Sequence, residues 1–216
     1  MLLLFCDWRK IMYILVADSC GCGLGILGEI ARYNNMPYAI FLADGQMNPF
    51  GLRSTLEIQN IVEDWLKYFT NPPYVIKMLV VACNTASISI MGGFQQYLET
   101  RYNVRIVNII ESTVRAVPEA VIDDKCNIAN IAVLGTKRTI ESGIYQCLIS
   151  ESLSKAKYHN IRVQGIICTG VERAVARGEG NSEEVAQIAN ANYKIIRGNL
   201  IMLFMPVLAF LLLRRR

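Results

Sequence analysis

The sequence predicts an α/β fold in which two lobes each carry a parallel sheet, with an active-site cleft between them. Short apolar runs alternate with amphipathic segments, and this alternation is typical of parallel sheets covered by helices on both faces. The apolar runs end in small or polar residues, as strand-to-helix turns do. At 216 residues and 53% apolar composition, the chain is long enough for one large domain or two small ones.

The first lobe is predicted from residues 13 to 110, after an N-terminal extension of residues 1–12. A helix follows the glycine-rich turn after the first apolar run and is expected to reach about Tyr33. Ser54 and Glu57 have the spacing of a capping box, and the apolar residues after them recur at helical intervals. The strands of this lobe are predicted at residues 13–17, 39–42, 78–82 and 105–109.

The second lobe is predicted from residues 111 to 198, with the polar stretch 122–127 separating the two series of elements. A helix is expected from about Thr139, and Ser182 is expected to cap a later helix that runs to about Ile196. The strands of this lobe are predicted at residues 130–134 and 161–167.

Residues 199–216 are predicted to form a hydrophobic strand, over 200–203, and a basic tail. The apolar run 200–213 is shorter than the ~20 residues of a membrane-spanning helix and contains Pro206. A buried strand is therefore favoured over a membrane anchor, which stays open as the alternative.

The net charge of the chain limits its expected binding partners, and its cysteines indicate the cellular compartment. The formal net charge is +4, and three of those charges belong to the terminal arginines, so the rest of the chain is nearly neutral. Without a basic stripe, nucleic acid is not an expected partner. The seven cysteines are odd in number and scattered, and the first residues do not have the charge order of a secretory signal. We therefore expect reduced thiols and a cytoplasmic location.

The segment with the strongest functional signal is the apolar run that stops at Cys83 and continues as Asn84-Thr85. This pattern places a thiol at the carboxyl end of a buried parallel strand, where ligands of open α/β sheets bind. A thiol near a helix N-terminus can have a depressed pKa. A buried structural cysteine is the competing interpretation. Other predicted strands also end in polar residues, and together these side chains are expected to line a cleft between the lobes: Asp18-Ser19, Asp44, Glu111, Gly135-Thr136 and Cys168-Thr169.

These motifs together resemble the aspartate/glutamate racemase superfamily, and most closely its glutamate racemases, over about residues 13 to 180. The matching segments are Asp18-Ser19 and the glycines after it, Asp44 with Pro49-Phe50-Gly51 and Ser54, Cys83 to Ser87, Ile110-Glu111, Val133 to Thr136 with Thr139, Ser142 and Tyr145, and Cys168 ahead of Gly178.

The resemblance implies a cytoplasmic, cofactor-independent racemase that interconverts L- and D-glutamate for peptidoglycan synthesis. It implies an acidic amino acid as the ligand and no metal, while the oligomeric state stays open, with a homodimer as one option. By match, Cys83 is one acid/base and Asp18 assists it. The residues matched to substrate binding are Ser19, Pro49, Phe50, Gly51, Asn84, Thr85 and Thr136. Backbone amides at strand-to-helix turns suit carboxylates as they suit phosphates.

The sequence departs from this family at several places, and one of them is the acidic residue expected shortly before Gly178, where Ala176 and Arg177 stand. The family has a second catalytic cysteine, within Gly-Cys-Thr-His, at the end of a late strand, but residues 200–208 contain neither cysteine nor histidine. Cys20 and Cys22 replace two glycines of the first turn. The chain also ends before the segment that, in the family, returns to the first lobe.

Three hypotheses follow: a working racemase, a catalytically impaired relative that binds an acidic amino acid, and a Cys-dependent hydrolase or transferase that uses Cys83 as nucleophile. The single histidine, His159, matches no catalytic position and is expected on a solvated loop.

Overall fold

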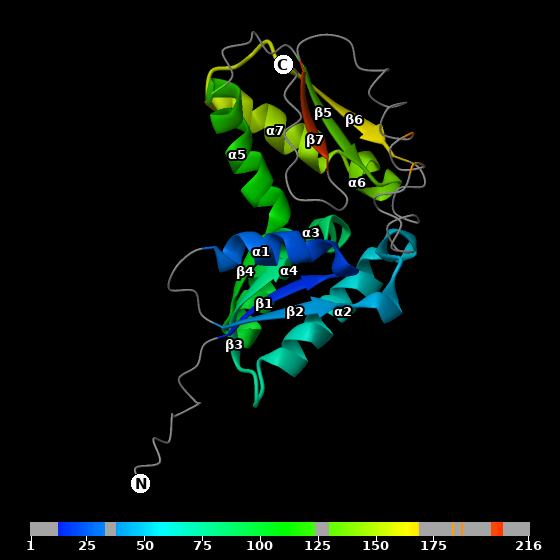
Figure 1. Ribbon diagram of the computed structural model, residues 1–216, viewed down its shortest axis with the longest axis vertical. Helices are drawn as coiled ribbons and strands as arrows, with labels where there is room; N and C mark the ends of the chain where they lie inside the picture. The colour runs from blue at the N-terminus through cyan, green and yellow to red at the C-terminus, as the bar shows by residue number, and fades with distance from the viewer. Residues whose placement is uncertain are drawn as a thin grey trace.

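The computed structural model describes residues 13–32, 38–123, 130–168, 183, 187 and 200–204. Two parallel sheets organise this part of the chain, and in Figure 1 they lie one above the other. Several predicted features lie outside the described residues: the extension 1–12, the helix end at Tyr33, the helix from Ser182 to Ile196, and the tail after residue 204. The lobe boundaries at residues 110 and 198 stay predictions.

The first sheet has four parallel strands in the order β2-β1-β3-β4. They are β1 (Tyr13–Asp18), β2 (Tyr38–Ala43), β3 (Ile76–Val81) and β4 (Arg105–Asn108). All four predicted strands are confirmed, with ends that move by one or two residues. The last one is shorter than predicted because Ile109 already begins a helix.

Helices connect and cover these strands, as a parallel sheet requires. They are α1 (Leu24–Ala31), α2 (Thr55–Phe69), α3 (Asn84–Ile90) and α4 (Gly93–Tyr102), with short 3₁₀ helices η2 (Gly21–Gly23), η3 (Gly45–Met47) and η4 (Phe50–Leu52). The predicted capping box is present: the Ser54 hydroxyl accepts from the Glu57 amide at 3.2 Å, and the Glu57 carboxylate accepts from the Ser54 amide at 2.8 Å.

The amphipathic stripe of α2 packs against the sheet and forms much of the first core. Ile58, Val62 and Leu66 are fully buried there, together with Leu15 and Leu79 of the central strands. Burying side chains of this size contributes about 1.5–3 kcal/mol each, before chain entropy is subtracted. The sheet is therefore anchored by its two central strands, which also carry the candidate catalytic residues.

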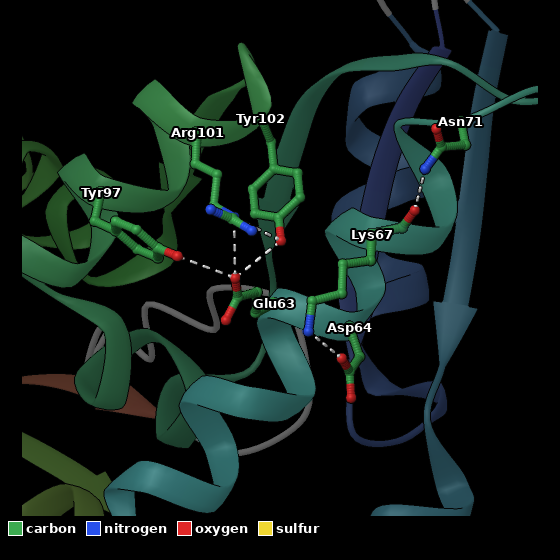
Figure 2. A network of polar contacts seen from close by, with 7 residues as sticks. All are labelled: Glu63, Asp64, Lys67, Asn71, Tyr97, Arg101 and Tyr102. Atoms are coloured by element: carbon green, nitrogen blue, oxygen red, sulfur yellow. Dashed lines mark hydrogen bonds and ion pairs between the residues drawn. The ribbon is translucent and has the colours of Figure 1, made fainter.

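A polar network ties α2 to α4 on the outside of this core (Figure 2). The Glu63 carboxylate accepts hydrogen bonds from the Tyr102 hydroxyl at 2.9 Å and the Tyr97 hydroxyl at 3.2 Å, and forms an ion pair with Arg101 at 3.4 Å. Three donors on one carboxylate fix the position of α4, and α4 leads into β4.

The second sheet has the order β6-β5-β7, again parallel. Its elements are α5 (Ile109–Asp123), β5 (Asn130–Gly135), α6 (Lys137–Glu141), α7 (Ile144–Lys155), β6 (Arg162–Ile167) and β7 (Leu200–Phe204). The three predicted strands are confirmed. Helix is present where it was predicted, from about Thr139, but Gly143 with a φ of +67° divides the segment into α6 and α7. Helix α5 was not predicted.

Contacts between the two halves come from a few side chains. Arg138 of α6 donates hydrogen bonds to the Arg53 carbonyl, to the Thr55 hydroxyl at 2.9 Å and to the Ser89 hydroxyl at 3.4 Å. Helix α5 also packs against both α3 and α7. These contacts fix the end of the first sheet that carries Cys83 relative to α6 and α7.

The expected loop position of His159 is confirmed, because this residue is exposed. Among the described residues, Cys20, Cys22, Cys83 and Cys147 are free thiols. No helix within the described part of the chain is long and apolar enough to cross a membrane.

Gly23 is expected to be sensitive to any side chain, because a Cβ there would lie 2.9 Å from the Ala82 Cβ, 3.0 Å from the Phe41 ring and 3.1 Å from the Asp18 Cβ. We predict that Gly23→Ala lowers the free energy of unfolding by about 1–3 kcal/mol, measured by urea denaturation. Gly21→Ala is the matched control, since a Cβ at Gly21 meets nothing within 4 Å. Equal stability of the two variants would contradict the prediction.

Candidate active site

The candidate site forms where β1 and β3 end side by side. Ala17 pairs with Val81 in parallel register, and the Ala82 amide donates to the Ala17 carbonyl at 2.8 Å. Asp18 is the last residue of β1, Ser19 follows it, and Cys83 comes two residues after β3, so these residues lie at the same edge of the sheet. Polar groups from two segments more than 60 residues apart in the sequence are thus brought together.

Cys83 occupies the position just before α3 and is only 7% exposed. Its Sγ lies 3.5 Å from the Ser19 hydroxyl. Asp18, 4% exposed, accepts the Ser19 amide at 2.7 Å. A buried carboxylate, hydroxyl and thiol in direct succession form a chain along which a proton can move.

Burial sets the protonation of this group. The pKa of the Cys83 thiol is raised to about 12, first by burial and then by the negative charge of Asp18. Burial also raises the pKa of Asp18, against hydrogen bonds from Ser19, Gly23 and the Cys83 thiol. The thiol is therefore protonated at neutral pH. A positive charge brought close to it would favour the thiolate.

Two further predicted site residues, Asn84 and Thr85, follow Cys83 at the start of α3. The Asn84 amide oxygen accepts from the Tyr145 hydroxyl of α7 at 2.5 Å. Thr85 is buried, and its carbonyl accepts from the Ser89 hydroxyl at 2.8 Å. Asn84 is thus held from the second half of the chain, although it belongs to the first.

The predicted residues Pro49, Phe50 and Gly51 lie beside the end of β2. The Asp44 amide donates to the Asp18 carbonyl at 2.8 Å, which joins this loop to the end of β1. Phe50 is buried, its ring is 6.1 Å from that of Trp65, and η4 contacts α3. The Phe50 ring therefore packs in the core, so a ligand near this loop would meet its backbone.

The remaining strand-end residues make other contacts or are exposed. Thr136 follows β5 of the second sheet, and its hydroxyl caps α6 by accepting from the Thr139 amide at 3.3 Å. Asp44 accepts from the Trp65 indole at 2.8 Å, which is a structural role. Glu111 is exposed on the first turn of α5, and the buried Cys168 donates its amide to the Gly135 carbonyl.

Two residues that position the site were not predicted to do so. Tyr145 is fully buried in α7 and reaches Asn84 across the two halves, and Arg138 holds the loop before α2. The sequence gives one signal for Tyr145, a phenol among the apolar residues of a helix, since a buried tyrosine hydroxyl needs a partner. Arg138 gives no such signal, because arginines on helices are usually solvated.

The comparisons with known proteins agree with this arrangement. The glutamate racemase of Oceanobacillus iheyensis is 29% identical over 175 residues, which are 81% of this chain and 58% of that protein. This chain is glutamate racemase-like. It spans less than two thirds of the length of that curated relative. No protein-family model matches the chain.

Solved structures show the same fold. A glutamate racemase of Bacillus anthracis superposes with a TM-score of 0.70 at 24% identity, covering 90% of this chain and 68% of that one. The Francisella tularensis glutamate racemase, solved in complex with D-glutamate, has a TM-score of 0.64 at 21% identity and covers 84% of this chain and 62% of that one. The predicted α/β fold with two parallel sheets is therefore confirmed.

The raised pKa of Cys83 predicts slow alkylation by iodoacetamide with an unusual pH dependence. Because only the thiolate reacts, the rate at Cys83 should keep rising with pH past about 8.5, the pKa of a free cysteine. Peptide mass spectrometry measures this rate, with a short cysteine-containing reference peptide in the same sample. Asp18→Asn should raise the Cys83 rate at neutral pH, since it removes a negative charge. A Cys83 profile that superposes on that of the reference peptide would refute the prediction.

Proposed function

We propose that this chain is a cytoplasmic, cofactor-independent racemase that interconverts L- and D-glutamate for peptidoglycan synthesis, with Cys83 as one acid/base. The observation that carries this proposal is the buried Cys83 thiol beside Ser19 and Asp18, in a chain similar to glutamate racemases over about four fifths of its length. The D-glutamate in the Francisella tularensis complex supports an acidic amino acid as the ligand.

The α-hydrogen of an amino acid is a very weak acid, so its removal needs a strong base in a site with little water. The Cys83 thiol has a high pKa because it is buried next to Asp18. A bound amino acid brings a positive ammonium group, which shifts the equilibrium towards the thiolate. In one direction the thiolate takes the α-proton, and in the other the thiol returns a proton to the carbanion on the same face. Asp18 accepts a hydrogen bond from the thiol and orients it.

We assign the surrounding residues to binding the two carboxylates and the amine. The strand-end residues contribute hydroxyl and amide groups to binding, and the loop after β2 contributes backbone groups. The set is Ser19, Pro49, Phe50, Gly51, Asn84, Thr85 and Thr136. The Tyr145 hydroxyl positions Asn84, and Arg138 positions the loop before α2. A cleft between the lobes and a homodimer remain part of the proposal; light scattering on the purified chain tests the dimer.

A second candidate function is binding of an acidic amino acid without turnover. Strand β7, which pairs with β5, has the sequence Leu-Ile-Met-Leu-Phe and therefore no thiol. Racemisation needs an acid/base on each face of the α-carbon, and the resemblance to the family implies that the second one belongs at the end of this strand. A protein with Cys83 alone would exchange the α-proton of one enantiomer and retain its configuration.

Incubation with L- or D-glutamate in D₂O separates these two functions. The racemase predicts α-deuteration of both enantiomers with inversion, measured by proton NMR and chiral chromatography. The impaired relative predicts deuteration of one enantiomer without inversion, or binding without exchange. Absence of both binding and exchange contradicts either function.

Cys83→Ala should lower the exchange rate by about 100-fold to 10 000-fold, the usual contribution of a general acid/base. Cys147→Ser is the matched control, because Cys147 is exposed on α7 and should leave the rate unchanged. Exchange that persists at the full rate in Cys83→Ala would overturn the role of this thiol.

A further inference from the structure

Three metal-ligating side chains meet at the turn between β1 and α1. The Asp18 carboxylate and the thiols of Cys20 and Cys22 each offer one ligand atom, and these atoms all lie within 4.8 Å of one another. The Cys20 Sγ is 2.8 Å from the Cys22 Sγ and 3.8 Å from the Asp18 Oδ2. The racemase chemistry proposed for Cys83 uses neither of these thiols.

The composition of this cluster selects a class of ligand. Two sulfur atoms and one carboxylate oxygen are a donor set that suits Zn²⁺ and similar thiophilic cations, and hard cations such as Mg²⁺ prefer oxygen alone. Both thiols are partly exposed, so an ion can reach them from solvent, and Asp18 is buried behind them.

Binding of a cation would also change the charge of this cluster. Metal binding to thiols displaces their protons, and a divalent cation would partly neutralise the resulting thiolates and the Asp18 carboxylate.

We propose that Asp18, Cys20 and Cys22 bind a thiophilic divalent cation of the Zn²⁺ class, with a fourth position open to water or to another ligand. Tetrahedral coordination at Zn–S distances of about 2.3 Å would require the two sulfurs to separate to about 3.8 Å.

A cation at this site would affect Cys83, because Asp18 interacts with the Cys83 thiol and is also one of the proposed ligands. In the metal-free chain the Asp18 carboxylate accepts a hydrogen bond from the Cys83 thiol. A cation bound to Asp18 would compete for that carboxylate and would place positive charge close to Cys83. The metal site itself does not depend on the racemase activity, because its ligands and its test are separate from turnover.

The test is a titration of the reduced full-length chain with Cd²⁺ in the presence of a phosphine reductant. The thiolate-to-cadmium charge-transfer absorbance should saturate at one equivalent. Cys20→Ser and Cys22→Ser should each weaken binding at least about tenfold, since even the loss of an outer-shell partner costs that much. The matched control Cys147→Ser should bind as the parent chain does.

A second measurement needs no variant and so does not depend on whether the variants fold. Zn²⁺ should protect Cys20 and Cys22 from alkylation in the parent chain and leave Cys147 reactive, as read by peptide mass spectrometry. Cadmium binding that is unchanged when both cysteines are replaced overturns the proposal. A Cys20–Cys22 disulfide that persists in the reductant would also overturn it. The absence of both cadmium binding and protection from alkylation would do the same.

Discussion

The parallel pairing of β1 with β3 is the constraint on which the candidate site depends. Ala17 and Val81 lie in register, and the Ala82 amide continues the ladder by one hydrogen bond to Ala17. A shift of one residue would turn alternate side chains to the other face, so the buried strands on both sides specify the register strongly. The positions of Asp18 and Cys83 follow from this pairing, as does the burial that keeps the thiol protonated.

Much of the first sheet could be predicted from sequence because its signals are local. Strands buried on both faces appear as apolar runs, and the Ser54–Glu57 capping box marks the start of α2. The split between α6 and α7 could not be predicted in this way. It depends on a positive φ at Gly143, and the sequence indicates that backbone conformation only by the presence of a glycine. Helix α5 was missed although it follows β4 directly, and Pro118 inside it is an unfavourable helix signal.

The candidate site, like the fold, could be predicted where its signals are local in the sequence. Strand ends identified Asp18, Ser19 and Cys83, because parallel strands end at one edge of a sheet. The contacts of Asn84 with Tyr145 and of Arg138 with the loop before α2 join parts of the chain that no local pattern connects. The approach of Cys20 to Cys22 depends on the conformation of a single turn, so the sequence shows only that the two cysteines are separated by one glycine.

The central claim is that an acidic amino acid binds against Cys83, whether or not the chain turns it over. The most direct measurement is the rate of Cys83 alkylation by iodoacetamide with and without saturating D- or L-glutamate, with Cys147 as the internal reference. A ligand seated over the thiol predicts a slower reaction at Cys83 and an unchanged one at Cys147. Equal rates at Cys83 with and without either enantiomer would contradict the account.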